Sequence, residues 1–434
     1  MRINPAYKLL TVALCSSLLC ACRSTPTVLE AAITQAAQYS ANGEYSAAES
    51  LLQAHVASPD PAPAMALADL YTTWQRPTLG LSTLDAAQAR GIRASDVLTR
   101  RLTLLMMDRQ WQQAMEHALD HLRDNPDNVT ALHAATEASL ILGKCEDAAE
   151  YARQWTASAP ASPRAALIYG LLYEDAAALC QVDDGLCALA TGCEGHCTGD
   201  LGILLAERQD WGLANCALAA GLTFDADNPR LHMWLGASYA RFDAPLLAED
   251  HFSTAVTLDP DNPQAWLLYG AFALQTGNWE TATKALSNAH QLDPRNPAPC
   301  LAIAELMAMQ SRYEDMDTWV NAALARAVQD IDVWKSAARL YLSRHMVRSD
   351  MLYYITGSAV RMEPQDAEAH LLLGWAYLLQ DQPDQAMNEI EQALELDGSL
   401  GQAHYFKGII LDAQGQTGEA DIALTRAADL GYFP

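Results

Sequence analysis

The sequence predicts an all-α solenoid in which about two dozen short helices stack as about twelve antiparallel pairs. Three observations lead to this fold class. A pattern of small, aromatic and large apolar residues recurs every 34 residues along most of the 434-residue chain. Half of the residues are hydrophobic and only 6 are Phe, a composition that suits close-packed helices better than sheets. No stretch without the repeat is long enough to form a separate domain.

The stretch 263–296 contains the clearest copy of the pattern. Gly270 and Ala282 stand where two antiparallel helices would approach, so no large side chain fits at either position. Gly277 can take the positive φ of a turn between helices, and Pro294 stops the second helix from continuing. The pattern residues of this unit are Trp266, Tyr269, Gly270, Gly277, Trp279, Ala282, Leu286, Ala289 and Pro294.

The same frame continues in both directions in steps of 34 residues. Its phase barely slips from about residue 61 to the end, whereas a chance match would drift. The unit 297–330 is degenerate, and the next unit is two residues longer than the rest. The other units are 61–94, 95–128, 129–162, 195–228, 229–262, 331–366, 367–400 and 401–434, with a weaker one near 29–60.

This pattern resembles the tetratricopeptide repeat, and the resemblance covers nearly the whole chain after its first residues. It implies a right-handed superhelix with a concave inner groove and a core that is continuous along the axis. It also implies a protein that is not an enzyme and that binds other proteins or peptides through the groove. No cofactor, metal or small-molecule substrate is expected.

The segment 163–197 departs from the frame and divides the array into 29–162 and 198–434. Its first helix looks normal, with Tyr169, Gly170 and Tyr173 in place. The cysteine-rich second half has two glycine turns, which shorten or interrupt a helix. We therefore expect an irregular hinge here.

Residues 1–21 are predicted to be a targeting segment that does not belong to the fold. Arg2 and Lys8 precede an apolar run, 9–19, that is too short to span a bilayer comfortably. The composition of this segment predicts export from the cytoplasm. An ordinary signal peptide or a signal anchor would share these features.

The end of the targeting segment resembles the lipobox of bacterial lipoproteins, because the small Ala21 stands directly before Cys22. The resemblance implies cleavage before Cys22, a lipid on its side chain and a short linker, 22–28. Arg23 follows, where an aspartate would imply retention at the inner membrane. We therefore expect a lipid anchor on the periplasmic face of the outer membrane.

The formal net charge of -26 argues against nucleic acid and anionic lipid headgroups as partners. An acidic surface repels nucleic acid and anionic lipid headgroups. It favours solubility and basic partners.

Seven of the ten cysteines lie beyond Cys22. In an oxidising periplasm their crowding predicts disulfides that staple a loop, although the sequence does not give the pairing. Since seven is odd, at least one thiol remains free or pairs elsewhere. A metal site of Cys187, Cys193, His196 and Cys197 is the alternative, but its spacing matches no zinc ribbon or haem motif. The candidate disulfide cysteines are Cys180, Cys187, Cys193, Cys197 and Cys216.

No catalytic motif is present, since the sequence has no nucleophile elbow, no His-Glu-x-x-His and no phosphate-binding glycine loop. The resemblance instead places function in the groove, which positions 2, 5, 9, 12 and 13 of each first helix line. In the last two units these positions hold an apolar, aromatic strip that would mark a binding surface if exposed. Adjacent helices or the chain end could instead cover it. The strip consists of Leu371, Trp375, Leu378, Leu379, Tyr405 and Ile409.

The anchor and the fold together predict a lipid-anchored scaffold of the bacterial envelope that supports assembly of a pilus or an outer-membrane secretion machine. The alternative is a periplasmic adaptor that regulates cell-wall hydrolases or proteases. Groove position 9 is Ala271, Trp375 and Ile409 in three units, so the Lys and Asn clamp that binds free carboxylate tails in some relatives is absent.

Overall fold

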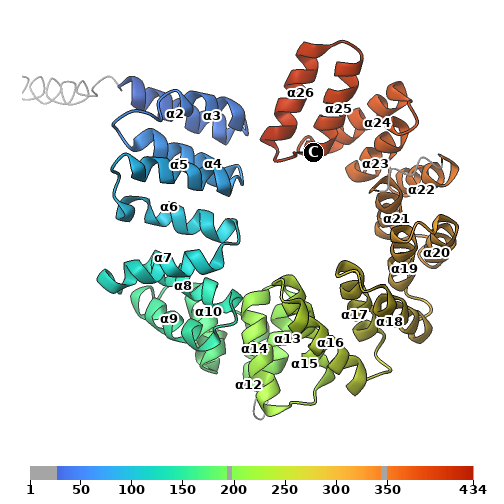
Figure 1. Ribbon diagram of the computed structural model, residues 1–434, viewed down its shortest axis with the longest axis horizontal. Helices are drawn as coiled ribbons and strands as arrows, with labels where there is room; N and C mark the ends of the chain where they lie inside the picture. The colour runs from blue at the N-terminus through green and yellow to red at the C-terminus, as the bar shows by residue number, and fades with distance from the viewer. Residues whose placement is uncertain (1–26, 193–197, 344–348, 434) are drawn as a thin grey trace, which may run out of the picture. The chain divides into compact units, whose positions relative to one another are not determined.

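The computed structural model describes residues 27–192, 198–343 and 349–433, and over these ranges the chain forms 25 helices and no strand. Within each unit, most successive helices pack as antiparallel neighbours joined by short turns (Figure 1). They make twelve pairs, one of which has its second helix broken in two. The predicted all-α solenoid is therefore confirmed.

The chain separates into two compact units, 1–100 and 101–434, and α6 runs across the boundary. In the described part of the first unit, the core is made by Leu52, Leu67, Tyr71 and Trp74. The helices of this unit are α2 (Val28–Ala41), α3 (Tyr45–Gln53), α4 (Ala62–Thr73), α5 (Pro77–Ala89) and the beginning of α6 (Ala94–Met107).

The second unit holds the remaining helices, and its buried side chains form a series of clusters along the array. Its helices are α7 (Trp111–Asp124), α8 (Val129–Ile141), α9 (Cys145–Ser158), α10 (Pro163–Leu172), α11 (Ala176–Cys180), α12 (Asp184–Gly192), α13 (Thr198–Glu207), α14 (Trp211–Phe224), α15 (Pro229–Arg241), α16 (Pro245–Leu258), α17 (Pro263–Gln275), α18 (Trp279–Leu292), α19 (Ala298–Met309), α20 (Tyr313–Arg326), α21 (Ile331–Ser343), α22 (Ser349–Met362), α23 (Ala367–Leu378), α24 (Pro383–Leu396), α25 (Gly401–Ala413) and α26 (Thr417–Asp429).

Five of the pairs are held by a glycine of the first helix that faces a large side chain 16 residues later in the second. A Cβ on Gly270 would lie 2.5 Å from Cδ2 of Leu286, so only a glycine permits this crossing. The glycine thus lets the two backbones approach closely. The same relation joins Gly202 to Leu218, Gly236 to Phe252, Gly374 to Ile390 and Gly408 to Leu424.

In each regular repeat whose turn is described, that turn contains one residue with a left-handed backbone. Glycine fills this position in Gly43, Gly143, Gly277 and Gly415, where it has no steric cost. Other residue types take the same conformation at the same frame position, namely Gln75, Arg109, Gln209, Asp243, Ser311 and Asp381. The local conformation is therefore fixed by the packing of the pair as well as by residue type.

Five of the turns between repeats are closed by a ring nitrogen at position 4 of the following first helix. Trp266 Nε1 donates to the carbonyl of Pro260 at 2.8 Å, and Trp334 Nε1 donates to Ala327 at 3.0 Å. Histidine replaces tryptophan in three repeats, where Nε2 lies 2.9 to 3.1 Å from the corresponding carbonyl. These rings are His232, His370 and His404, which bond to Ala226, Pro364 and Gly398.

The irregular repeat differs from the expectation in its first helix. Glu174 takes the left-handed conformation (φ 54°), three residues before the frame position 177. Consequently α10 has 10 residues, whereas α17 has 13. The first helix is thus shortened, and the second is divided into α11 and α12.

Residues 1–26 lie outside the described residues, and with them the predicted targeting segment and Cys22. Within the described ranges, none of the helices combines the length and the apolar character that crossing a bilayer requires.

The glycine crossing gives the first testable prediction. Gly270→Ala gains about 1 kcal/mol of helix propensity but introduces an overlap that costs about 1–3 kcal/mol, so a net loss of roughly 1 kcal/mol is expected. Gly418→Ala is the matched control, since a Cβ there meets nothing within 4 Å. Thermal unfolding followed by circular dichroism should show a lower midpoint for the first variant and an equal or higher one for the second. Equal shifts in both variants would contradict the role given to the crossing.

Candidate protein-binding surfaces

The predicted C-terminal strip is largely covered in the structure. Leu371 is 4% exposed and packs in the core of the last repeats, so its prediction as a surface residue is wrong. The ring of Trp375 packs against Phe406, with centroids 5.4 Å apart. Leu378 and Leu379 are half-buried, which leaves Ile409, 40% exposed, as the open member.

The end of the chain covers Tyr405, the remaining member of the strip. The ring centroids of Tyr405 and Tyr432 are 5.4 Å apart. Gly401 permits this return of the chain, because a Cβ there would lie 2.8 Å from Cβ of Tyr432. The short apolar end therefore docks on the last helix pair.

A hollow of about 320 Å³ lies instead between α6 and α8, and we call it the methionine hollow. Its residues occupy positions 8, 9, 12 and 13 of one repeat and 2, 5 and 6 of the next, so the frame already marked most of them as groove residues. Methionine side chains adapt to irregular partners and are frequent at such binding surfaces. The hollow is lined by Leu102, Thr103, Met106, Met107, Thr130, His133 and Ala134.

The floor of the methionine hollow is electrically neutral at neutral pH. Burial lowers the pKa of His133, and the charge of Arg164 lowers it further, whereas Glu137 opposes the shift. The His133 ring also packs on Trp155, with centroids 4.8 Å apart. An uncharged imidazole beside two methionines suits an apolar side chain.

Arg164 neutralises the carboxylates next to the hollow. Its Nε lies 2.6 Å from Glu137, and its Nη1 pairs with Asp210. Burial alone would lower the pKa of Arg164, but the bonds to both carboxylates outweigh it and raise the pKa. The guanidinium therefore stays charged and ties α8, α10 and the turn before α14 together.

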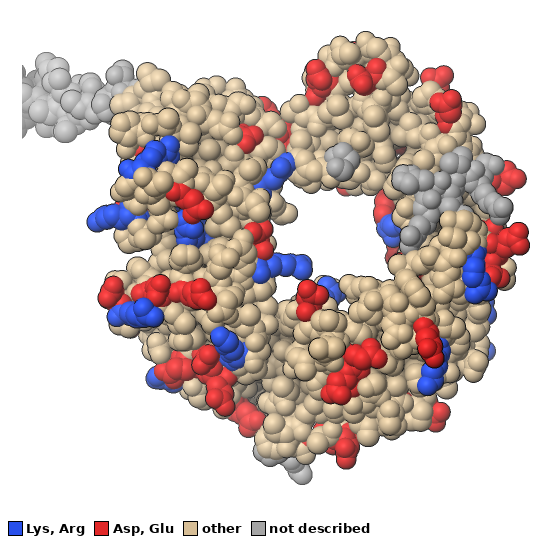
Figure 2. All heavy atoms as spheres, viewed as in Figure 1, with Lys and Arg blue, Asp and Glu red and all other residues tan. Residues whose placement is uncertain are grey.

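The first unit has a similar hollow of about 400 Å³ between α2 and α4. Ile33, Ala36 and Leu70 form part of its wall. Its carboxylate, Asp69, is held by Arg100 through two bonds of 2.7 and 2.8 Å. This hollow is also apolar, with its charge compensated. Charged residues are interspersed over the face in Figure 2, most of which is uncharged.

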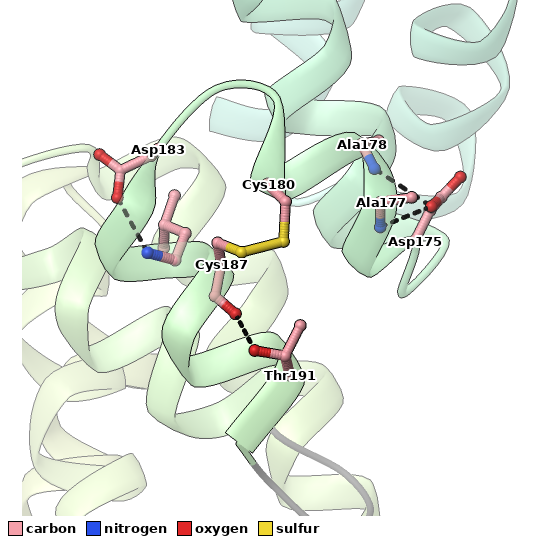
Figure 3. Close-up of a disulfide and its surroundings, with 8 residues drawn as sticks. Asp175, Ala177, Ala178, Cys180, Asp183, Cys187 and Thr191 are labelled. Atoms are coloured by element: carbon pink, nitrogen blue, oxygen red, sulfur yellow. Dashed lines mark hydrogen bonds between the residues drawn. A yellow bond between two sulfur atoms is a disulfide. The ribbon is translucent and has the colours of Figure 1, made fainter.

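Two disulfides form around the irregular repeat. Cys180–Cys187 joins α11 to α12 (Figure 3). Asp175 caps α11 by accepting bonds from two backbone N–H groups, and Asp183 does the same for Leu186 at the start of α12. These caps allow two very short helices to form.

The second disulfide, Cys145–Cys216, joins α9 to α14 across 71 residues. Sequence reasoning named Cys216 but not Cys145, because the partners are close only in the fold. Cys193 and Cys197 lie outside the described residues. Cys300 is a buried free thiol whose pKa is raised by burial.

The alternative metal site loses one of its ligands, since Cys187 is bonded to Cys180 and has no thiolate to offer. Across the described ranges, no three His, Cys, Asp or Glu side chains are placed to hold a metal ion.

The irregular repeat and the helices packed around it, α8, α9, α13 and α14, form what we call the stapled corner. Helix α14 packs against α8 as well as α13, although α8 belongs to the repeat two positions earlier. Gly212 allows this approach, because a Cβ there would lie 3.2 Å from Ile141. Together with Arg164 and the disulfide, this contact fixes the segment that the sequence predicted to be a hinge.

Comparisons with known proteins agree with a repeat fold. The family described as "Cilia and flagella-associated protein 70 C-terminal domain" matches residues 218–409, less than half of the chain. No curated protein matches. Pseudomonas aeruginosa PilF is 18% identical, with a TM-score of 0.40, over 49% of this chain and 96% of that chain.

Two further similar structures differ in how much of this chain they match. Yeast Tom70 is 14% identical, with a TM-score of 0.39, over 93% of this chain and 92% of its own. PilW, a type IV pilus biogenesis factor, is 16% identical, with a TM-score of 0.39, over 45% and 90%. TM-scores below 0.5 at these identities do not establish what this chain does.

The two disulfides should differ in their contribution to stability. The chain-entropy relation gives about 4 kcal/mol for a separation of 71 residues and about 2 kcal/mol for 7. Denaturant unfolding without reductant should therefore show the larger loss for Cys145→Ala/Cys216→Ala. Cys180→Ala/Cys187→Ala is the matched control, and an equal or larger loss in that variant would refute the stapled corner.

Proposed function

We propose that this protein is a non-enzymatic scaffold of the bacterial envelope that binds other proteins through the methionine hollow. The single observation that carries the proposal is the hollow itself, which is apolar, neutral and lined mostly by groove positions of two adjacent repeats. An apolar side chain of a partner would bury its surface there without meeting an unpaired charge. No chemistry beyond binding is required.

The proposal includes a lipid anchor on Cys22 and a place on the periplasmic face of the outer membrane. Its support is the order of residues in the targeting segment and the small Ala21 before Cys22. Two disulfides in the structure agree with an oxidising compartment.

The partners in this proposal belong to a pilus or an outer-membrane secretion machine under assembly. The support is the combination of anchor and repeat fold, which is analogy rather than site chemistry. The pilus factors among the similar structures add no weight, because their TM-scores are below 0.5. The alternative is an adaptor for cell-wall hydrolases or proteases.

The methionine hollow can be tested by crosslinking in cells followed by pull-down of the full chain. Met107→Glu places a charge in the hollow, so its partners should be recovered at least about tenfold less. Leu246→Glu is the matched control, since Leu246 is 85% exposed and lies on α16, outside the hollow.

The identity of the lost partners decides between the two roles. Pilus or secretion components support the scaffold, and hydrolases or proteases support the adaptor. An unchanged partner set in Met107→Glu would contradict the use of this hollow.

The anchor has its own test. Cys22→Ala should move the protein from the membrane fraction to the soluble periplasm and abolish labelling by a radioactive fatty acid. Cys20→Ala is the control and should leave both unchanged. Labelling that persists in Cys22→Ala would place the lipid on another residue, and a wild-type protein without label would rule the lipid out.

A further inference from the structure

A further pocket, of about 460 Å³, opens at the stapled corner, and we call it the corner pocket. Its wall comes from α9, the end of α10, the start of α13 and α14. The Cys145–Cys216 disulfide forms one side of it. The pocket is separate in sequence from the methionine hollow.

The corner pocket exists because the irregular repeat lacks a full second helix. In a regular array, such a helix would lie between α9 and α14, the second helices of the flanking repeats. Here α11 has only 5 residues, and the disulfide draws α9 and α14 together. The space that remains is the pocket.

The floor of the corner pocket is apolar but contains one unsatisfied polar group. Leu171, Ala217 and Ala220 provide aliphatic surface. The hydroxyl of Thr198, a residue 5% exposed, has no hydrogen-bond partner among the described residues. A buried hydroxyl without a partner is costly, so a ligand atom that bonds to it would be favoured.

The rim of the corner pocket is acidic. Glu146 and Glu174 are both exposed, and no lysine or arginine is among the described residues that line the pocket. Tyr173 is 44% exposed and packs on Tyr169, with ring centroids 4.8 Å apart. An aromatic face beside two carboxylates attracts a cation.

We propose that the corner pocket binds an arginine side chain presented by a partner protein. The aliphatic stem would cover the floor, the planar guanidinium would lie over Tyr173 between the two glutamates, and one N–H would reach Thr198. The proposal rests on the proposed function, since it adds a second contact for a protein partner. Charge complementarity selects this occupant over an apolar one.

The test uses the purified full-length chain and the tripeptide acetyl-Leu-Arg-Leu-amide, with the citrulline peptide as a neutral isosteric control. Titration followed by amide NMR shifts should show saturable binding of the arginine peptide, with shifts around Tyr173 and Ala217. The citrulline peptide should bind about tenfold more weakly or not at all. Equal affinities would overturn the proposal.

Two sets of variants locate the binding. Glu146→Gln/Glu174→Gln should weaken the arginine peptide about tenfold, whereas the matched double variant Glu314→Gln/Glu419→Gln, on exposed glutamates of other repeats, should not. Ala220→Trp fills the pocket and should abolish binding. Tyr173→Ala should also abolish binding, and because Tyr173 is 44% exposed this variant adds no bulk to the pocket wall. Binding that survives in both Glu146→Gln/Glu174→Gln and Tyr173→Ala would place the peptide elsewhere.

Failure of this proposal can be distinguished from failure of the proposed function. Loss of partners in Met107→Glu without peptide binding would refute the corner pocket and leave the scaffold standing. Peptide binding with an unchanged partner set in Met107→Glu would support the pocket and refute the use of the methionine hollow.

Discussion

The close crossing of the two helices of a repeat, made at a glycine in five of the pairs, is the contact on which the rest of this structure depends. Where Gly270 meets Leu286, the missing Cβ sets how near the two axes can lie. Each repeat then offers its neighbour a surface of the same shape, so the next pair can stack upon it. The ring nitrogens of Trp266 and its equivalents close the turns that join one pair to the next. The groove is a consequence of this stacking.

The stapled corner departs from regular stacking, and this departure explains why a disulfide and the Arg164 ion pairs hold it together. A regular repeat interacts only with its neighbours, so stability spreads along the array from one pair to the next. Here α14 contacts α8 across an intervening repeat. Because Glu174 ends α10 early, the irregular repeat loses packing area, and a disulfide and the Arg164 ion pairs supply the missing contacts. The corner therefore couples directly two repeats that would otherwise be coupled only through the repeat between them.

The fold could be predicted from the sequence because its determinants recur at a fixed spacing. The small residue at position 8 and the proline after the second helix predict each helix pair from residues within one repeat. The stacking of the pairs then follows from their repetition. The corner could not be predicted in this way. Nothing near Cys145 indicates that it meets Cys216, since that contact depends on a helix two repeats away. Glu174 likewise has a backbone conformation that its residue type does not favour.

The sequence predicted an apolar binding surface on the first helices of two adjacent repeats, but it placed this surface in the last two repeats, whereas the methionine hollow lies at α6 and α8. The groove frame correctly describes how side chains of adjacent first helices come together, yet in the last repeats the aromatic residues find partners within the chain. Trp375 packs on Phe406, and Tyr405 packs on Tyr432, because large rings beside a free chain end bury one another. At α6 and α8 the groove residues are methionines and a neutral histidine, which leave a hollow. The exposure of a groove side chain thus depends on which side chains of the neighbouring repeat pack against it. The repeat frame assigns positions within one repeat at a time, so it does not predict these contacts.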